Sequence, residues 1–494
     1  MRFRNSVVLL ALLGCSASVR DAREVEIAGI LARADDALIR SRPALTEGKY
    51  ATMASGEYSF FRGSLAVYKS DWRRGVLGSS RFSLDAPLVP SLGDAHPENF
   101  GTMRAADGSV SLEPNDFDAA DRAPYLWDVR RLCAGFALSA MLANEDDPTA
   151  REATTRERGP IARAVAIGYR DAVAAAAEGV PAGRVTSGEG NALLADLFRR
   201  AHRDYDARAE LDALTVMTGE GRRLKRGVLD ESDPENVFAD LPPLVREALP
   251  DAMARYRNTL AAPPAEEEFV LLDAVREFGS GVASWSKVRI MLLVRGPTDA
   301  SEDDLILELK ELGDSTVGGF YPPNTYNNTV EERVLHAAHA AWSRPDADPL
   351  WGTSSLLGLP VQIKTEAEGN KTIRVARMTG ESGTVATLTD LARQLGAVVA
   401  RVHTADAKER SVAQAIAARI ATDPEGFADE QADVAAAYAL RVMSDRVSFQ
   451  DALTHLGPLL GVTPSASDAP PSNLSALLGT PPQSTRAVSK ESSP

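Results

Sequence analysis

Cysteine and histidine are scarce in this sequence. Only two cysteines, Cys15 and Cys133, and six histidines occur among its 494 residues. Two cysteines cannot build a disulfide framework. The histidines are scattered and form no cluster with cysteine, so we expect no zinc site. Cys133 lies in the apolar helical run LCAGFALSAML, where we expect it to be a small core residue.

Basic residues and long apolar runs are also in short supply. Lys and Arg number 54 against 69 Asp and Glu, which gives a formal net charge of −15. An acidic protein repels nucleic acid and anionic membrane surfaces, so no nucleic-acid partner is expected. No segment approaches the length of a membrane-spanning helix. The composition is 44% hydrophobic, which is ample for a large core in one elaborated two-lobe enzyme or in two or three domains.

The N-terminus, MRFRNSVVLLALLGCSAS, has the pattern of an export signal. Two arginines followed by a short apolar stretch are typical of a secretory signal peptide. The Leu-x-Gly-Cys sequence that ends at Cys15 resembles a bacterial lipobox. That resemblance implies cleavage before Cys15, lipidation of its thiol, and an exported lipoprotein that meets the membrane only through this anchor. The alternative is a mis-assigned start codon upstream of a cytoplasmic protein.

Composition divides the chain into six segments and predicts an α+β fold. The segments are a signal peptide at 1–15, an N-terminal segment at 16–150, a helical section at 151–265 with a polar loop near 218–240, a β-rich section at 266–385, C-terminal helices at 386–462, and a Pro/Ser-rich tail at 463–494. We expect the tail to be disordered. Within these segments we expect a loop leading into a helix at 53–75, an antiparallel meander near 269–312, and a strand at 371–378.

The stretch SLGDAHPENFG contains Asp94 and Asn99 in an Asp-x-x-x-x-Asn spacing, with His96 between them. Phosphoryl transfer needs a carboxylate that can take the proton of the acceptor hydroxyl, and hard oxygen ligands for Mg²⁺. A kinase catalytic loop places its aspartate and asparagine at this spacing. We therefore expect Asp94 and His96 to be catalytic and Asn99 to be a metal ligand.

A second acidic motif, Asn115-Asp116-Phe117-Asp118, follows a predicted hairpin. A carboxylate beside an aromatic residue at this point holds Mg²⁺ between the β- and γ-phosphates in kinases. We expect Asp116 and Asp118 to be metal ligands. Asp128, at the start of a helix in LWDVRRL, is expected to support the catalytic loop through hydrogen bonds. Each motif alone is also compatible with a turn or a solvated loop, but their order along the chain favours the catalytic interpretation.

The phosphate-binding parts expected of a kinase occur after these motifs. Gly279, Ser280 and Gly281 join two predicted strands, and the backbone N–H groups of such a loop can cradle phosphates. Lys310 lies amid apolar residues on a later strand, and Glu331 begins a helix from which it could pair with that lysine. A glycine pair is also compatible with a tight turn, and a strand lysine with a solvent-facing edge.

The segments that follow complete the kinase order. The strand predicted at 371–378 would be the hinge, and the helix at 391–403 resembles the one that normally leads into the catalytic loop. We therefore expect a protein-kinase-like two-lobe fold, circularly permuted, with residues 266–385 as a lobe that binds ATP and Mg²⁺. Permutation costs little where the new ends fall in exposed loops. Lys310 and Asp116 would then face one cleft, on the order of 10 Å apart.

Several of these motifs carry a family resemblance. GDAHPENFG, NDFD and WDVRRL, together with FFRG at 60–63, closely resemble the signatures of the bacterial family known as domain of unknown function 2252. They are also similar to the Gly-Asp-x-His-x-x-Asn and Asp-Trp/Phe-Glu/Asp motifs of aminoglycoside and choline kinases. The resemblance extends through most of residues 50–455 and is weakest at 150–265. It implies a kinase-like fold, while the family name assigns no activity.

Two functions fit these features. One is an ATP-dependent and Mg²⁺-dependent phosphotransferase that acts on a small molecule or a protein. The other is a catalytically inactive kinase-like lipoprotein that binds a ligand or partner, which an exported location favours because exported proteins meet little ATP. A metal phosphoesterase built on Gly93-Asp94-Ala95-His96 would need more histidines, and a Ser-His-Asp hydrolase would need a G-x-S-x-G elbow.

Overall fold

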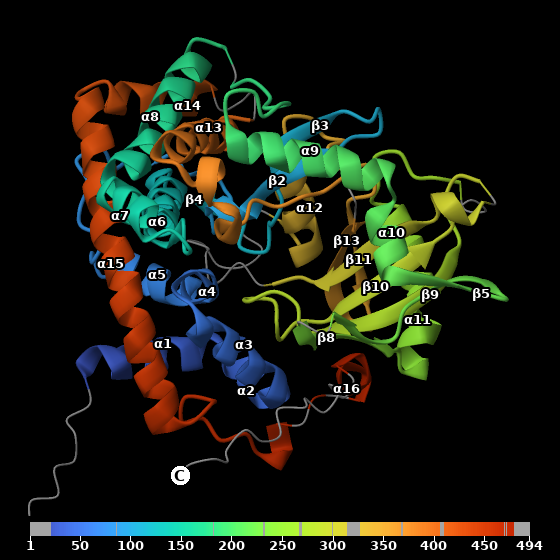
Figure 1. Cartoon of the computed structure of the whole chain (residues 1–494). Coiled ribbons are helices and arrows are strands. Elements are labelled where there is room, and N and C mark those ends of the chain that lie inside the picture. Colours follow the sequence, from blue (N-terminus) through green and yellow to red (C-terminus); the bar gives the residue numbers. More distant parts are fainter. Residues whose placement is uncertain are drawn as a thin grey trace, which may run out of the picture.

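The computed structural model has a mixed α+β architecture in which every strand pairing is antiparallel among the residues it describes. Helices gather on the left of Figure 1 and the large sheet lies on the right. The described residues are 21–478 without 85, 181, 231–232, 266–268, 299, 314–326, 367–368, 406–409, 469 and 471. The predicted signal peptide and Cys15 fall outside them, as does the end of the tail.

The chain enters the described part through short helices. Their bounds are α1 Ala22–Ala34, α2 Asp36–Ser41, α3 Pro43–Ser55, α4 Glu57–Gly63 and α5 Leu65–Arg73. The loop predicted at the start of 53–75 is therefore wrong. Glycines at both ends of the segment are typical of loops. Gly56, however, is a single residue with an extended backbone between helices α3 and α4. Phe60 and Phe61 of α4 are each 1% exposed, and burying these two rings stabilises the helix.

Two small two-stranded sheets and a buried helix follow. β1 (Val89–Ser91) pairs with β4 (Asp121–Ala123), and β2 (Phe100–Arg104) pairs with β3 (Val110–Pro114). The short 3₁₀ helix Pro97–Asn99 lies between β1 and β2. Helix α6 (Leu126–Leu142) is buried along almost its whole length, Asp128 and Cys133 included, which explains its nearly continuous apolar sequence.

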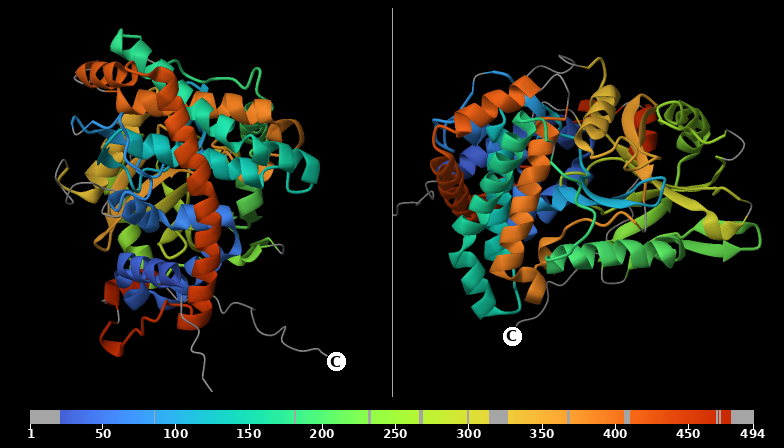
Figure 2. Two further views of the ribbon diagram at one scale, coloured as in Figure 1. Left: turned by 90° about the vertical axis from the view of Figure 1, so that its left-hand side faces the viewer. Right: turned by 90° about the horizontal axis from the view of Figure 1, so that it is seen from above.

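A bundle of long helices surrounds α6. It consists of α7 Pro148–Arg156, α8 Arg158–Ala177, α9 Ala192–Asp206, α13 Val385–His403, α14 Arg410–Ile420 and α15 Pro424–Leu456. Helices α8 and α13 touch at glycines, because a Cβ on Gly168 would lie 1.9 Å from the Arg393 carbonyl oxygen and one on Gly396 would lie 2.1 Å from the Val165 carbonyl oxygen. The α15 helix, drawn orange-red, runs along the outside of this bundle (Figures 1 and 2).

The seven-stranded sheet has the order β12-β13-β11-β10-β9-β8-β7. Its bounds are β7 Gly227–Asp230, β8 Asp233–Asp240, β9 Leu271–Phe278, β10 Arg289–Val294, β11 Leu305–Glu311, β12 Gly352–Leu356 and β13 Leu359–Thr365. The predicted meander is thus confirmed as β9-β10-β11. One face of the sheet packs against α11 (Pro243–Arg257) and α16 (Ser472–Leu478) in an apolar core. Helix α12 (Val330–Ala341) lies between β11 and β12 in sequence.

Two of the predicted segments are corrected. The section predicted to be helical at 151–265 contains the hairpin β5 (Thr215–Thr218) and β6 (Gly221–Leu224), and also β7 and β8. These strands were missed because they are polar and partly exposed, with Val216 and Val228 facing solvent, so they lack the alternation of half-buried strands. The tail predicted to be disordered from 463 contains α16, which buries Leu477 in the sheet core.

The strand predicted at 371–378 is also wrong. Thr372 forms only an isolated bridge with Gly101, and residues Val375–Arg377 form a 3₁₀ helix. A Cβ on Gly101 would lie 2.4 Å from the Lys371 carbonyl oxygen, so glycine allows the two segments to meet. In the described part of the chain, no helix is both long enough and apolar enough to cross a membrane.

Candidate functional site

Asp94 lies in the loop between β1 and the Pro97–Asn99 turn. Its Oδ1 accepts a hydrogen bond of 2.8 Å from Nε of Arg131, one turn after Asp128 on α6. The Arg131 guanidinium stacks 3.6 Å from the Phe61 ring and donates to the Phe61 carbonyl. Burial raises the pKa of Asp94, and the Arg131 charge opposes that rise. A carboxylate held in this way can take a proton from a hydroxyl group.

Asp128 fixes the chain just before Asp94. Its carboxylate is fully buried and accepts hydrogen bonds from Ser91 Oγ at 2.9 Å, Leu92 N at 2.7 Å and Gly93 N at 3.1 Å. Nε2 of His403, at the end of α13, lies 3.1 Å from Oδ2 of Asp128. The expected support of the loop by Asp128 is therefore present as direct contacts.

His96 lies behind Asp94. It is 1% exposed, its Nε2 is 3.7 Å from Asp94 Oδ2, and its ring packs on the edges of Tyr58 and Phe61. Burial and the nearby cations, including Arg62, lower the pKa of His96 well below its ordinary value. His96 is thus a buried side chain whose Nε2 lies near the Asp94 carboxylate.

Glu98 explains the arginine of the FFRG segment. Its Oε2 accepts from Arg62 at 2.8 Å and from Arg374 at 3.4 Å, while its Oε1 accepts from the Val375 amide at 2.8 Å. The ion pairs join α4, the loop that carries Asp94 and the segment after β13. The Phe61 ring lies near His96 and Arg62 pairs with Glu98, so both contact the same loop.

Asn99, Asp116 and Asp118 form the predicted metal-ligand group. Asn99 donates from Nδ2 to the Asp94 carbonyl at 2.8 Å, which fixes the amide and leaves its oxygen as the atom that could bind a cation. The Asn115 amide donates to the Asn99 carbonyl at 3.1 Å, so the two motifs are joined. Asp116 accepts from the Asp118 amide at 3.1 Å and has a side chain that is 36% exposed.

Lys310 reaches this turn from the sheet. Its Nζ lies 3.5 Å from Asp116 Oδ2 and 3.1 Å from Asp118 Oδ2, so the two distant motifs meet as the sequence predicts. Lys287 also contacts Asp118, at 2.5 Å. Burial alone would raise the pKa of Asp118, but the two lysines outweigh it and hold that pKa below its ordinary value. Burial alone would lower the pKa of Lys310, and Asp116 and Asp118 raise it.

Helix α12 contributes Arg333 to the site. The buried Arg333 guanidinium donates to the carbonyls of Phe117, Asp118, Ala120 and Gly313. These bonds hold the turn that carries the two aspartates. Among the described residues, Lys310 has Asp116 and Asp118 as its ion-pair partners, and no ion pair joins it to Glu331. The expected Lys310–Glu331 pair is therefore not formed.

The glycine segment is a turn between β9 and β10. Gly279 and Gly281 have φ values of 80° and 82°, which only glycine adopts without strain. Ser280 Oγ accepts a hydrogen bond of 2.9 Å from Arg289 on β10. A Cβ on Gly281 would lie 2.3 Å from Ser284 Oγ. A simple turn and a phosphate-binding loop both use glycines with positive φ. The geometry of Gly279 and Gly281 is therefore compatible with both interpretations.

A comparison with protein-family models decides the family. The model described as an uncharacterized protein conserved in bacteria, DUF2252, matches residues 40–452. The chain belongs to the DUF2252 family. The match includes Asp94, Asp116 and Lys310, so both halves of the site lie within the family region. No curated protein and no solved structure matches the chain.

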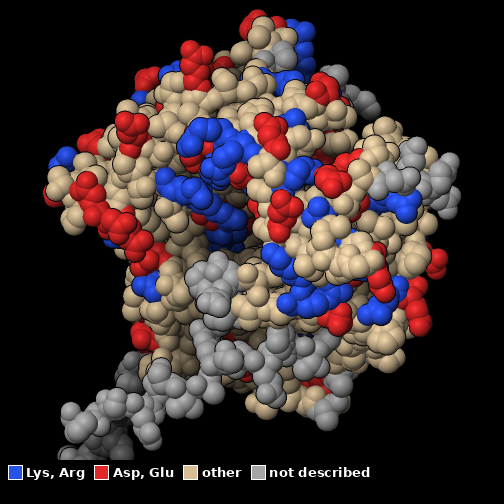
Figure 3. All heavy atoms as spheres, turned by 45° about the vertical axis from the view of Figure 1, so that its right-hand side comes forward, with Lys and Arg blue, Asp and Glu red and all other residues tan. Residues whose placement is uncertain are grey.

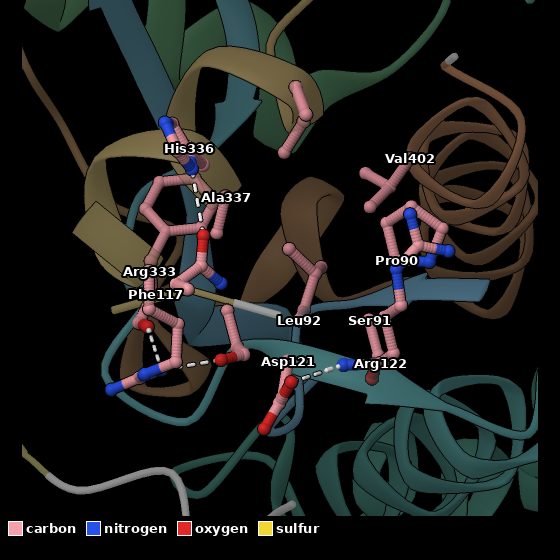
Figure 4. A pocket seen from close by; sticks show the side chains of 14 residues that line it. Pro90, Ser91, Leu92, Phe117, Asp121, Arg122, Arg333, His336, Ala337 and Val402 are labelled. Carbon is pink, nitrogen blue, oxygen red and sulfur yellow. Dashed lines mark hydrogen bonds between the residues drawn. The ribbon is translucent and has the colours of Figure 1, made fainter. Parts of the chain in front are cut away.

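A cavity of about 290 Å³ in this DUF2252 protein adjoins the aspartate turn at Phe117. Its walls come from α12, β1 and β4, and both apolar and polar side chains line it, among them Phe117, Leu92, Val402, His336 and Arg122 (Figure 4). His336 Nδ1 lies 2.7 Å from Asn327 Oδ1. The cavity adjoins Phe117 and Arg333 and is separate from the Lys310–Asp116 contact.

Some residues of the DUF2252 site escaped the sequence analysis. Arg131 could have been found, because it lies one turn after Asp128 in LWDVRRL. Lys287, Arg333 and the pairing of His403 with Asp128 had no local signal. Each becomes part of the site only when segments that are far apart in sequence fold together.

Proposed function

We propose that this protein is a kinase-like, magnesium-dependent phosphotransferase with a circularly permuted chain. The single observation that carries the proposal is the contact of Lys310 with Asp116, 194 residues apart in sequence. A lysine beside a metal-binding aspartate and a loop bearing Asp94 and Asn99 are the parts that position and neutralise a transferred phosphoryl group.

The topology of the sheet supports the kinase-like assignment. Strands β9, β10 and β11 run consecutively, β9 and β10 are joined by the glycine turn, and Lys310 is on the third strand. Helix α12 comes next, and the chain returns through β12 to place β13 beside β11. A kinase places its glycine loop, its β3 lysine and its αC helix in this sequence. The catalytic loop comes first here, which is the permutation.

The oxygen ligands suit Mg²⁺. Across the described residues there is no group of three or more His, Cys, Asp or Glu side chains that could hold a metal ion. Mg²⁺ usually binds through one or two carboxylates, waters and substrate phosphates. Asp116 and Asn99 would hold the ion, which would neutralise the charge on the phosphates when bound. Asp118, which contacts Lys287, would be a further ligand of the ion.

The reaction follows from these positions. An acceptor hydroxyl would lose its proton to the Asp94 carboxylate, while its oxygen forms a bond to the terminal phosphorus of the donor. The bond from that phosphorus to the bridging oxygen breaks, and the shortened donor leaves. Lys310 would hold the donor phosphates. Lys and Arg side chains gather around a hollow on the face drawn in Figure 3, which suits an anionic donor in a protein of net charge −15.

A catalytically inactive binder is the second function, and the lysine contacts favour it. Lys310 contacts Oδ2 of Asp116 and of Asp118, and Lys287 contacts Oδ2 of Asp118, so a metal ion would compete with the lysines for these oxygens. In this function the same cleft would bind a ligand without turnover. We propose for both functions that a lipid on Cys15 is the only membrane contact, that no nucleic acid binds, and that the acceptor or partner is a separate molecule.

A thermal-shift titration tests the proposal. ATP with Mg²⁺ or Mn²⁺ should raise the unfolding midpoint of wild type, because a ligand that binds only the folded state stabilises it. Lys310→Met should remove most of that shift. Lys371→Met is the matched control, because Lys371 pairs with Asp204 and Glu210 outside the cleft. An unchanged midpoint with every nucleotide and metal would contradict a phosphate-binding site.

A further inference from the structure

The face of the sheet that bears Lys310 is charged where a donor would lie. Side chains alternate between the two faces of a strand, so Glu308 shares the face of Lys310. Arg289 is directly opposite Lys310 on β10 and also opposite Glu277 on β9, and on β13 Gln362 is opposite Lys310 and Lys364 is opposite Glu308. We call these residues the sheet roof: Glu277, Arg289, Glu308, Lys310, Gln362 and Lys364.

The roof is held together by its own ion pairs. Arg289 Nε lies 3.5 Å from Glu277 Oε2 and 3.5 Å from Glu308 Oε1, and Lys364 Nζ lies 3.7 Å from Glu308 Oε2. Glu277 and Glu308 are buried. Lys310 of the roof contacts Asp116 and Asp118, so the roof adjoins the aspartate turn.

The apolar positions of the same face are already covered. Farther along the strands, Val275, Met291, Leu293 and Ile306 replace the charged residues. They form a closed cluster with Leu211 of the short α10 helix (Ala209–Leu214), Leu224 of β6 and Phe238 of β8. Among the described residues, this face therefore passes from charged side chains beside Lys310 to apolar side chains beneath the β5–β6 hairpin.

A nucleobase requires a different surface. It is a flat aromatic group that binds in slots lined mainly by apolar and aromatic side chains, with a few polar groups to orient it. A base placed under the roof would lie against Glu308 and Arg289, which already pair with each other, and it offers no charge that matches theirs. The adenosine part of ATP therefore does not fit this roof, whereas the phosphate part fits Lys310 and the glycine turn.

We propose that the donor is recognised through its metal-bound phosphate chain alone, with no selection for a nucleobase. The inference rests on the proposed phosphotransferase function and names the donor class of that site. Nucleoside triphosphates and inorganic polyphosphate share this chemistry. An exported lipoprotein meets little ATP, and a site that binds only the phosphate chain does not depend on it.

Isothermal titration of the full chain in Mg²⁺ tests the donor class. The probes are tripolyphosphate, ATP, GTP, CTP and adenosine. We expect the dissociation constants of tripolyphosphate and the three nucleotides to agree within about threefold, and adenosine to give no binding. Lys310→Met should weaken all four phosphate ligands at least about tenfold, and Lys371→Met should change none of them.

Two outcomes would overturn the inference in distinguishable ways. ATP binding more than about tenfold tighter than both tripolyphosphate and CTP would show selection for the base and leave the phosphotransferase proposal standing. Absence of binding by every phosphate ligand would reject the phosphotransferase proposal itself, and the donor class with it.

Discussion

Nε2 of His403 lies 3.1 Å from Oδ2 of Asp128, and neither side chain is exposed to solvent. Because a carboxylate oxygen accepts, His403 donates from Nε2, and its Nδ1 lies 2.9 Å from the Tyr169 hydroxyl. Asp128 also receives the Ser91 hydroxyl and the Leu92 amide. The end of α13 is thus tied to the loop that carries Asp94, although the two are far apart in sequence.

Asp128→Ala should destabilise the protein strongly. The substitution removes the acceptor of His403, of the Ser91 hydroxyl and of the Leu92 amide, and breaking such a buried pair costs about 3–5 kcal/mol. Urea unfolding measures the loss. Asp429→Ala is the control, because its pair with Arg163 is exposed and should change stability by less than about 1 kcal/mol. Equal losses in the two variants would contradict the anchoring role of Asp128.

Arg333→Leu should loosen the aspartate turn. Four carbonyls would lose their donor, and each one left buried without a partner costs about 1–3 kcal/mol. We expect lower stability and also weaker binding of Mg²⁺ with tripolyphosphate, measured on the folded protein by titration. Glu331→Ala, two residues earlier on α12, should leave that binding unchanged. If Glu331→Ala weakened binding as much as Arg333→Leu, that result would contradict this account and support the expected Lys310–Glu331 pair.

Parts of this fold could be predicted because their signals are local. The meander of β9, β10 and β11 has short apolar runs between turns, and Asp94 and Asn99 carry their spacing within one loop. Strands β7 and β8 could not be predicted. They complete a sheet edge with polar residues. The pairing of β8 with β9 and of β7 with β8, rather than their own pattern, makes them strands.

The site shows the same division. The supporting role of Asp128 could be predicted because Asp128 follows the NDFD motif closely in the sequence. The role of Arg333 depends on carbonyls in a turn more than two hundred residues earlier, as in its bond to the Phe117 carbonyl with a separation of 216. His96 was expected beside the chemistry, and only the packing of Tyr58 and Phe61 around it shows that it is buried.

Glu277→Gln should alter the pH dependence of stability. Burial raises the pKa of Glu277 from its ordinary value of 4.5 to about 7 in the folded protein. The folded state then binds more protons than the unfolded state between these values, so stability falls as pH rises through that window and levels off above it. The full loss is on the order of 3 kcal/mol.

Glutamine cannot ionise, so the variant should lack this loss. Urea unfolding at pH 5 and pH 8 should show Glu277→Gln gaining stability over wild type at pH 8 relative to pH 5. Asp36→Asn is a control at an exposed carboxylate, whose i,i+4 pair with Arg40 contributes little. A difference between wild type and Glu277→Gln that is the same at both pH values would contradict ionisation of a buried Glu277.

Cys15→Ser should prevent lipidation, because the thiol is the predicted acylation site. In the bacterial host, the wild type should partition with membranes and label with a fatty-acid probe. The variant should do neither and should keep its signal peptide. Detection of the intact Met1 peptide in protein from the cytoplasm would contradict the export prediction and support a cytoplasmic protein.

The most direct test of the phosphotransferase proposal is to separate turnover from binding at Asp94 and Asp116. Single-turnover phosphate transfer and Mg²⁺–tripolyphosphate affinity would be measured side by side for wild type, Asp94→Asn and Asp116→Asn. Loss of a base lowers the rate, whereas loss of a metal ligand lowers both rate and binding. We predict that Asp94→Asn binds normally but transfers at least about 100-fold more slowly, and that Asp116→Asn binds poorly. Wild type that binds the phosphate chain but transfers it to no acceptor, water included, with Asp94→Asn indistinguishable from it, would contradict the enzyme and leave an inactive binder.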